Sequence, residues 1–481
     1  MDQYKNGVNF MDICPQLDSQ SNEPLYLQLY HYFKEEIQSG GIPSFKRLPS
    51  IRELADDLHV SKTTIQTAYQ QLLAEGYIES KERSGYFVVE IENEPFGNLP
   101  HLSQPPSVKN HFSSEKEILI DFYLSGTDVN HFPFDKWKTC MNQSLDQDFL
   151  SYGDKRGEIG LCSALSDYLR QARAVNCTSE QIVMGAGTQT TVRLLCQLIG
   201  MDGKKIALEE PGYQGVRHVF QELGFEVVPI KLEDDGINLE ELEKSGAKVV
   251  YITPSHQYPL GMVMPITKRI KLLQWAEENG GLIIEDDYDG EFRYHGKPIP
   301  SLQGLDACGN VIYAGTFSKS LMPAIRMSYF VLPTKLLDRY QEKLSIYDQT
   351  VSRLHQRSLQ LFMESGEWQR HIRRMRKIYA KKHDLLLHTI KSVMGDYVEI
   401  TGQNAGLHIA MQVNSAKSAD ELVQIAEEAG VKVYSTTANW ISDQEQGAPL
   451  ILLGFGGLSE KQIIDGIEQI HKSWLPYYLM E

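Results

Sequence analysis

The sequence GLIIEDDY at residues 281–288 and the sequence VIYAGTFSKS at residues 311–320 decide the fold. Each is an apolar, strand-forming run that ends in polar side chains, with Asp286 in the first and Lys319 in the second. Lysine is costly to bury, so a lysine directly after an apolar strand either extends its amine to water or takes part in chemistry. A carboxylate at a strand end either pairs with a ring cation or caps the next helix. The residues alone leave these alternatives open.

Apolar runs and helical segments alternate on both sides of these two stretches, from Asp121 onward. QIVMGAG (181–187) precedes TTVRLLCQLI (190–199), and KVVYITP (248–254) is followed by another helical pattern. This alternation predicts an α/β domain with a mostly parallel sheet covered by helices on both faces. In such sheets ligands bind at the carboxyl ends of the strands, where Asp286 and Lys319 fall.

A third feature is the run of small residues at the start of the helix predicted after residue 187. Gly187, Thr188 and Gln189 suit a phosphate bound at a helix N-terminus, although a tight turn needs glycine in any case. A phosphate cradle, a strand-end aspartate and a strand-end lysine are together the parts that a pyridoxal 5′-phosphate site needs.

The N-terminal region shows a different pattern. SIRELADDL begins at Ser50 with Glu53 three residues on, which predicts a capping box, and KTTIQTAYQQLLAEG (62–76) predicts a second helix after a short turn. Two β-prone runs, 77–79 and 86–89, flank a charged loop. The order predicts a helix-turn-helix with a hairpin wing.

The second helix of this pair would enter a DNA major groove with its N-terminal end, and the wing and first helix would contact phosphates. The alternative is that these charged tips are only solvated. The residues expected to contact DNA are Arg52, Lys62, Thr63, Thr64, Gln66, Lys81 and Arg83.

Composition limits the remaining possibilities. A net charge of −16 argues against a protein that coats nucleic acid nonspecifically. Residues 46–89 carry six basic and six acidic side chains, so the DNA prediction rests on the positions of the basic residues and not on net charge. No apolar run approaches the roughly 18 residues that span a bilayer. The six cysteines are scattered without a CxxC pair, which predicts reduced thiols, no metal site and a cytoplasmic location.

At 481 residues the chain is too long for one core. We expect a flexible N-terminus (1–22), a winged-helix domain (23–90), a linker (91–120) and a large domain (121–481). Met11 is a second candidate start, because residues 1–10 show no pattern. The linker shows no sustained period and contains Pro95, Pro100, Pro105 and Pro106.

Longer motifs carry a resemblance to known families. Residues 48–88 resemble the GntR-type winged helix, and EEPGYQG (209–215), TPSHQYPLGMVMP (253–265), EDDYDGEFRY (285–294) and GTFSKSLMPAIRMSY (315–329) resemble fold-type-I aminotransferases. The whole chain is similar to the MocR/GabR subfamily of GntR transcription regulators. The resemblance implies a multidomain protein, a winged helix-turn-helix fused to a fold-type-I aminotransferase-like domain that binds pyridoxal 5′-phosphate.

The resemblance also implies roles for individual residues. Lys319 would form the Schiff base, Asp286 would pair with the pyridine nitrogen, Tyr288 would hydrogen-bond the ring hydroxyl and Tyr213 would stack on the ring. His256 and Gln257 would line the pocket or serve packing alone. The residues that would hold the phosphate are Gly187, Thr188, Gln189, Thr316, Ser318 and Arg326.

The sequence departs from the family pattern in three places. Gln66 stands where many relatives place arginine, Gly215 stands where amino-acid sensors can carry a basic residue, and no arginine follows Arg376 to clamp a substrate carboxylate. Arg217 lies nearby in sequence. A charge-assisted hydrogen bond contributes roughly 1.5–3 kcal/mol, so an ordinary α-amino acid would bind weakly.

The leading hypothesis is a homodimeric regulator of double-stranded operator DNA that senses pyridoxal 5′-phosphate, an amino acid, an amine or a dipeptide. The first alternative is a working aminotransferase with a DNA-binding appendage. The second is a scaffold that binds only DNA.

Overall fold

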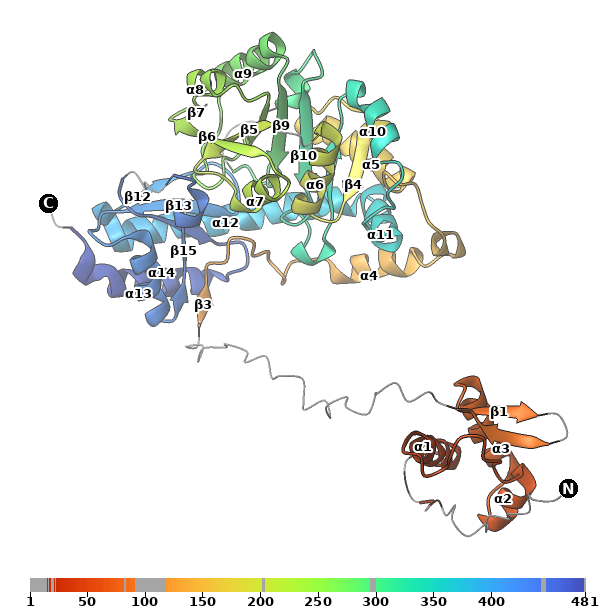
Figure 1. Ribbon diagram of the computed structural model, residues 1–481. Helices are drawn as coiled ribbons and strands as arrows, with labels where there is room; N and C mark the ends of the chain where they lie inside the picture. Colours follow the sequence, from red (N-terminus) through yellow and green to blue (C-terminus); the bar gives the residue numbers. More distant parts are fainter. Residues whose placement is uncertain are drawn as a thin grey trace, which may run out of the picture. The chain divides into compact units, whose positions relative to one another are not determined.

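The computed structural model describes residues 15, 17–18, 21, 23–81, 84–90, 118–200, 204–294, 300–442 and 447–479. The chain divides into two compact units between Phe112 and Ser113, the first drawn in red to dark orange and the second in light orange through yellow and green to blue in Figure 1. Much of the predicted N-terminal segment and most of the predicted linker lie outside the described residues. Among the described residues, every helix is too short or too polar to cross a lipid bilayer.

The first unit is a three-helix cluster with a hairpin. Its elements are α1 (Leu25–Gln38), α2 (Ile51–Asp57), α3 (Lys62–Ala74), β1 (Ile78–Lys81) and β2 (Gly85–Val88). The hairpin is antiparallel, with Ile78 opposite Val88. Apolar side chains at helical spacing, among them Phe33, Ile65 and Leu72, are fully buried between the helices. The predicted winged helix-turn-helix is confirmed.

The capping box predicted at the start of α2 is present. The Glu53 N–H donates to Ser50 Oγ at 3.2 Å, and the Ser50 N–H donates to Glu53 Oε2 at 3.1 Å. Ser61 caps α3 by accepting from the Thr64 N–H at 3.1 Å. These bonds satisfy N–H groups that lack a partner inside the helix, and they fix where both helices begin.

The second unit is built on an eight-stranded sheet of order β4-β11-β10-β9-β8-β5-β6-β7. The strands are β4 (Ile182–Gly185), β5 (Lys205–Glu210), β6 (Glu226–Glu233), β7 (Gly236–Ile237), β8 (Val249–Ile252), β9 (Leu282–Asp287), β10 (Val311–Thr316) and β11 (Ser328–Val331). The run β10-β9-β8-β5-β6 is parallel, as the sequence predicts. β11 is antiparallel to both β10 and β4.

Helices cover both faces of this sheet, and α6 and α7 lie in front of it in Figure 1. One apolar cluster joins α6, α7 and α10 to the sheet, and two others join α5, α8, α9 and α11 to it. The helices are α4 (Phe134–Gln143), α5 (Ile159–Arg173), α6 (Thr188–Ile199), α7 (Gln214–Glu222), α8 (Leu239–Ser245), α9 (Ile266–Asn279), α10 (Leu337–Lys343), α11 (Arg353–Glu364) and α12 (Glu367–Met394). Both faces of the sheet are therefore shielded from water.

The C-terminal part, blue in Figure 1, has its own four-stranded sheet of order β12-β13-β16-β15. Its elements are β12 (Val398–Thr401), β13 (His408–Val413), α13 (Ala419–Glu428), β14 (Val431–Lys432), β15 (Tyr434–Ser435), β16 (Leu450–Gly454) and α14 (Glu460–Trp474), and β14 pairs with β3 (Ile120–Asp121). The four-stranded sheet is antiparallel, which the sequence pattern did not predict. It is joined to the larger sheet region where the Gly406 N–H donates to Phe292 O at 2.8 Å.

The two units allow a direct test of their separate cores. Leu72 is fully buried in the first unit, whereas its neighbour Leu73 on α3 is 40% exposed. We expect Leu72→Ala to destabilise this unit by about 2–5 kcal/mol because it removes buried methyl groups and leaves a cavity. The measurement is the denaturant dependence of hydrogen exchange in peptides from residues 25–81, with Leu73→Ala as the control.

All five tryptophans lie beyond Ser113. Tryptophan fluorescence therefore follows only the second unit, and its unfolding midpoint should stay at the wild-type value in Leu72→Ala. An equal shift in fluorescence would show that the two units unfold together.

Candidate cofactor site and DNA-facing surface

A cavity of about 330 Å³ opens at the carboxyl ends of β8, β9 and β10. Nine residues predicted from the sequence line it together: Thr188, Gln189, Tyr213, Asp286, Tyr288, Thr316, Ser318, Lys319 and Arg326. Parallel strands bring their carboxyl ends to one edge of a sheet, so residues far apart in the chain meet there.

Asp286 lies near the end of β9 and is 4% exposed. The Tyr251 hydroxyl donates a hydrogen bond to Asp286 Oδ2. Burial, together with the neighbouring carboxylates of Asp287 and Asp289, raises the pKa of this carboxyl to about 7, and the hydrogen bond from Tyr251 opposes the rise. No cation among the described residues forms an ion pair with Asp286. A ring cation bound at this edge would supply the missing counter-charge.

Lys319 follows β10 and faces the same cavity. Its Nζ donates to the carbonyl of Leu124 and, at 3.4 Å, to Ser125 Oγ. Desolvation lowers the pKa of Lys319 to about 8, and the Asp289 carboxylate opposes that effect. A lysine with a lowered pKa is partly uncharged near neutral pH, which makes its nitrogen a nucleophile.

The far end of the cavity is suited to an anion. Gly187 precedes α6 with φ +91°, and a Cβ there would lie 2.3 Å from Arg326 Nη2. The guanidinium is therefore held against the backbone at the start of the helix. Thr316 Oγ1 donates to Ser318 Oγ at 3.1 Å beside it. A helix N-terminus, hydroxyl groups and an arginine fork together form an anion site.

Tyrosines form the cavity wall next to these groups. Tyr213 precedes α7, and its ring meets that of Tyr258 edge-on, with centroids 5.5 Å apart. Tyr258, Tyr123 and Leu124 also line the cavity but were missed by sequence reasoning. Tyr258 lies inside the TPSHQYPLGMVMP motif and could have been found there. The segment at Tyr123 and Leu124 gave no signal, because tertiary folding brings it to the cavity.

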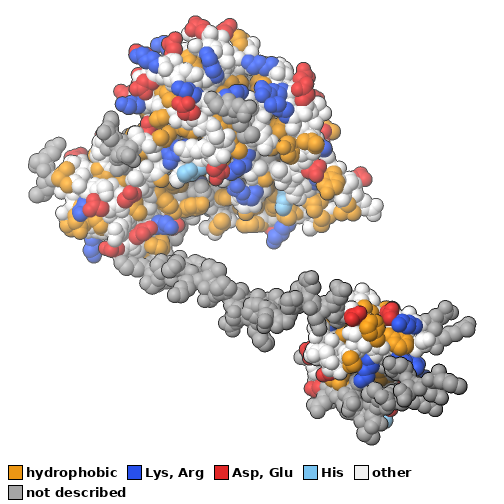
Figure 2. Space-filling view, viewed as in Figure 1, with side chains coloured by type: hydrophobic (Ala, Val, Ile, Leu, Met, Phe, Trp, Pro, Cys, Tyr) orange, Lys and Arg blue, Asp and Glu red, His pale blue; other side chains and the backbone are white. Residues whose placement is uncertain are grey.

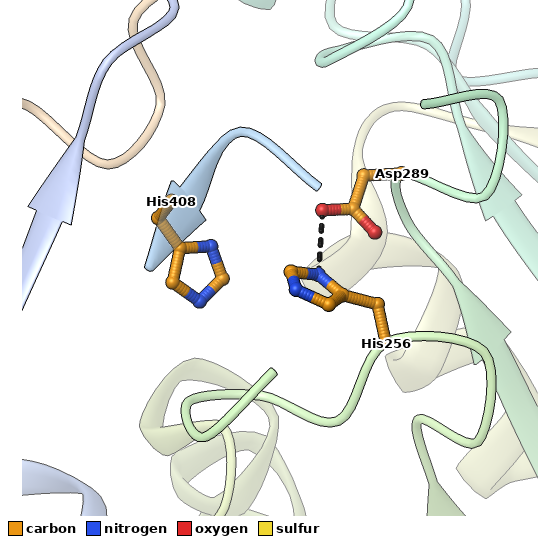
Figure 3. Close-up of side chains that lie close together, drawn as sticks. All are labelled: His256, Asp289 and His408. Atoms are coloured by element: carbon orange, nitrogen blue, oxygen red, sulfur yellow. Dashed lines mark hydrogen bonds and ion pairs between the residues drawn. The ribbon is translucent and has the colours of Figure 1, made fainter. Parts of the chain in front are cut away.

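Two predicted pocket residues lie behind the cavity wall. His256 Nδ1 is 2.9 Å from the Tyr288 hydroxyl and 2.9 Å from Asp289 Oδ2, as Figure 3 shows for the aspartate. The Gln257 amide donates to the carbonyls of Pro211 and Tyr258 and so ties two loops together. The geometry gives His256 a contact with a cavity residue and gives Gln257 a role in packing.

The first unit presents most of the residues predicted to contact DNA. Lys62, Thr63 and Gln66 are exposed near the N-terminus of α3, and Arg52 is exposed on α2. Thr64 is half-buried, and its hydroxyl hydrogen-bonds Ser61. These side chains surround the end of the helix that a helix-turn-helix places in the major groove.

In the wing, Lys81 is exposed and lies 2.9 Å from Glu79, and Arg83 falls outside the described residues. Arg47, which sequence reasoning did not select, is exposed and lies close to Gly85 of the hairpin.

Comparisons with known proteins match each of the two units to a known family. Residues 25–88 match the model of the bacterial regulatory proteins of the gntR family, and residues 123–441 match aminotransferase class I and II. The chain is 44% identical over 470 residues to the HTH-type transcriptional regulator YhdI of Bacillus subtilis, covering 97% of this chain and 99% of that protein. It is 32% identical over 473 residues to the probable rhizopine catabolism regulatory protein MocR of Rhizobium meliloti, covering 95% of each.

This chain belongs to the MocR type of GntR-family transcription regulators. Among solved structures, the kynurenine aminotransferase of Pyrococcus horikoshii superposes with a TM-score of 0.67 at 24% identity, over 75% of this chain and 92% of that one. This likeness shows that the second unit of the MocR-type chain has the aminotransferase fold.

Arg217, the arginine near Tyr213 in the sequence, makes hydrogen bonds to a neighbouring loop. The guanidinium of Arg217 donates to the carbonyls of Trp440 and Ala438, each at 2.8 Å. A Cβ on Gly215 would lie 2.7 Å from the Tyr213 hydroxyl, so no side chain fits there without movement. Arg217 therefore holds the loop at 438–440 and has these two hydrogen-bond directions committed.

The lowered pKa of Lys319 predicts a specific pH dependence. Only the uncharged amine attacks an acylating reagent, so the labelling rate of Lys319 should rise with pH to a midpoint near 8, well below the ordinary 10.5. Below that midpoint the rate should fall about tenfold per pH unit. Competitive labelling with acetic anhydride, followed by mass spectrometry of the Lys319 peptide, measures this midpoint.

Asp289→Asn gives the matched control, because the Asp289 charge raises the Lys319 pKa. Its removal should move the midpoint to lower pH. A wild-type midpoint near 10.5 would contradict the assignment of Lys319 as a desolvated amine.

Proposed function

We propose that this MocR-type regulator binds pyridoxal 5′-phosphate covalently through Lys319 and that the bound cofactor, with or without a small amino compound, controls its binding to operator DNA. The observation that carries the proposal is the convergence of Lys319, Asp286, Tyr288 and Arg326 on one cavity. The four residues come from two segments of the chain, 286–288 at the end of β9 and 319–326 after β10, and each would match a different part of the cofactor.

The donor set fits the cofactor at each end. Arg326 and the start of α6 would hold the phosphate, Asp286 would face the ring nitrogen and Tyr288 would donate to the ring hydroxyl. Tyr213 would cover a ring face. When bound, the cofactor supplies an aldehyde for reversible covalent capture of primary amines. The protein's part is to orient that group, exclude water and present an uncharged amine at Lys319.

DNA recognition is assigned to the first unit. The exposed positions Lys62, Thr63 and Gln66 would meet base edges and phosphates, and Arg52 with the wing would hold the backbone. Because net charge is −16, the contact depends on these few positions and not on general attraction to DNA. A cytoplasmic location belongs to the same proposal.

A homodimer is also part of the proposal. Leu150, Tyr152 and Ile346 are 84%, 88% and 77% exposed, which is unusual for large apolar side chains. Arg353 donates to the carbonyl of Ser151 at 2.6 Å and so brings residues 148–153 beside the segment after α10. Figure 2 shows hydrophobic side chains gathered along the edge over α4 and the segment that follows it. A second copy of the chain is the proposed partner for this surface.

The effector beyond the cofactor is proposed to be an amine, an amino acid or a dipeptide. The commitment of Arg217 to two carbonyl groups argues against a strong carboxylate clamp near Tyr213. Groups other than arginine would have to hold a carboxylate there.

The test is DNA binding by the full chain to the region upstream of its own gene, with and without pyridoxal 5′-phosphate. We expect a specific complex containing two chains whose affinity changes when the cofactor is added. Lys319→Ala should bind the DNA but lose the response to the cofactor, because the covalent anchor is gone. Gel shift and light scattering of the complex measure both properties.

The DNA contacts have their own matched pair. Lys62→Ala should weaken binding about tenfold and reduce its salt dependence, because a phosphate contact is lost. Gln70→Ala, an exposed change farther along α3, should leave affinity unchanged. Absence of specific retention under every condition would refute the regulatory proposal.

A second candidate function is favoured by the same cavity. Lys319, Asp286 and Tyr288 line one cavity, as an aminotransferase needs them, so catalytic turnover is the second function to measure. We expect partial reaction with amines but no sustained transamination, because no arginine after Arg376 is present to bind a carboxylate. Purified protein assayed with panels of amino donors and keto acids decides this. Many rapid turnovers would favour the enzyme.

A further inference from the structure

His256, Asp289 and His408 form a buried polar cluster (Figure 3). His256 follows β8, Asp289 follows β9 and His408 begins β13, and each is about 1% exposed. The cluster touches the cavity through Tyr288, whose hydroxyl oxygen is 2.9 Å from His256 Nδ1. His256 therefore reaches the proposed cofactor through Tyr288, whereas the Asp289 charge also acts on Lys319.

The hydrogen bonds of His256 fix where its proton lies. Nδ1 is 2.9 Å from Asp289 Oδ2 and 2.9 Å from the Tyr288 hydroxyl. A carboxylate only accepts hydrogen bonds, so Nδ1 must carry the hydrogen. The same Nδ1–H then makes a bifurcated hydrogen bond, which the Tyr288 oxygen also accepts. The phenol's own hydrogen is not used by His256, and it is available for donation into the cavity that Tyr288 lines.

Two features favour a proton over a metal ion at this place. Nitrogen and oxygen ligands of a tetrahedral zinc ion lie about 3.3 Å apart, farther than the 2.9 Å between His256 Nδ1 and Asp289 Oδ2. Burial also lowers the pKa of His408 to about 3, so His408 is uncharged near neutral pH. Its Nε2 is 3.2 Å from the carbonyl of Pro259 and is positioned to donate to it. His408 is thus occupied with the backbone.

The surroundings hold the His256 ring in this orientation. A Cβ on Gly406 would lie 2.0 Å from His256 Cε1 and 2.6 Å from Asp289 Oδ2, so the backbone there touches both side chains. Gly406 has φ +80°, a conformation that favours glycine. His256 Nε2 is buried and has no hydrogen-bond partner among the described residues. An unpartnered buried nitrogen costs about 1–3 kcal/mol, which the rigid packing sustains.

We propose that His256, oriented by Asp289, is a positioning residue that makes Tyr288 a hydrogen-bond donor toward the ring oxygen of the cofactor. The inference deepens the proposed function and rests on it for the identity of the acceptor. The placement of the Nδ1 hydrogen rests on the two 2.9 Å contacts alone.

The first experiment titrates the visible absorption band of the protein loaded with pyridoxal 5′-phosphate against pH. A donor to the ring oxygen withdraws electron density, so its loss lets the linked Lys319 nitrogen keep its proton to higher pH. Tyr288→Phe should raise the midpoint by about one pH unit, which corresponds to roughly 1.4 kcal/mol. His256→Leu should raise it in the same direction by a smaller amount.

Matched variants separate positioning from packing. His256→Asn places an amide donor near the Nδ1 position and should restore most of the wild-type midpoint. His408→Leu removes the neighbouring ring, whose centroid is 5.0 Å away, and should leave the midpoint unchanged. His256→Leu combined with Tyr288→Phe should equal Tyr288→Phe alone, because the effect passes through the phenol. A wild-type midpoint in His256→Leu, or equal shifts in the leucine variants of both histidines, overturns the proposal.

The second experiment needs no cofactor. In unloaded protein labelled with nitrogen-15 histidine, the His256 Nδ1 signal, assigned by its loss in His256→Asn, should be that of a protonated nitrogen bonded to a carboxylate. Asp289→Asn should shift it. An unprotonated Nδ1 overturns the proposal. Failure of wild-type protein to attach the cofactor instead refutes the proposed function, and the nitrogen-15 spectrum still decides the proton position.

Discussion

Desolvation of two buried ionisable groups, Lys319 and Asp286, is the constraint on which the site depends. It shifts the pKa of the lysine down to about 8 and that of the aspartate up to about 7. The two groups do not neutralise each other, since Lys319 donates to Leu124 and Ser125 while Asp286 accepts from Tyr251. The ionised form of Asp286 is disfavoured by folding, so this group's contribution to stability falls as pH rises from its ordinary pKa of 3.8 to its raised pKa of about 7. A ligand with an electrophilic carbon and a ring cation would relieve both shifts.

The sequence was sufficient wherever the structural signal is local. The capping box at Ser50 and Glu53, the break before α3 and the polar ends of β9 and β10 follow from spacing within a few residues. The antiparallel direction of β11 and the four-stranded sheet were not predicted, because strand direction depends on which segments pair and not on their own composition.

The residues of the cavity also divide into those with a local sequence signal and those placed only by tertiary folding. Asp286 and Lys319 were found from the strands that carry them, whereas Tyr123 and Leu124 reach the cavity only through tertiary folding. His256 was selected because it lies in a recognisable motif, yet a motif does not tell on which side of the wall a side chain lies. Its contacts with Tyr288 and Asp289 required coordinates.

The lysine also connects the cavity to the point where the chain enters the second unit. Leu124 and Ser125 follow β3, which pairs with β14 of the C-terminal part, and they accept hydrogen bonds from Lys319 of the larger sheet region. A free lysine ammonium has three hydrogens to donate, whereas a nitrogen bonded covalently to a cofactor retains at most one. Under the proposed function, cofactor attachment would therefore change the hydrogen bonds from Lys319 to Leu124 and Ser125. These residues lie near the start of the second unit, on the side of the chain that leads to the DNA-binding unit. A ligand controls a regulator only if it binds one arrangement better than another, and this change is a physical difference between two such arrangements.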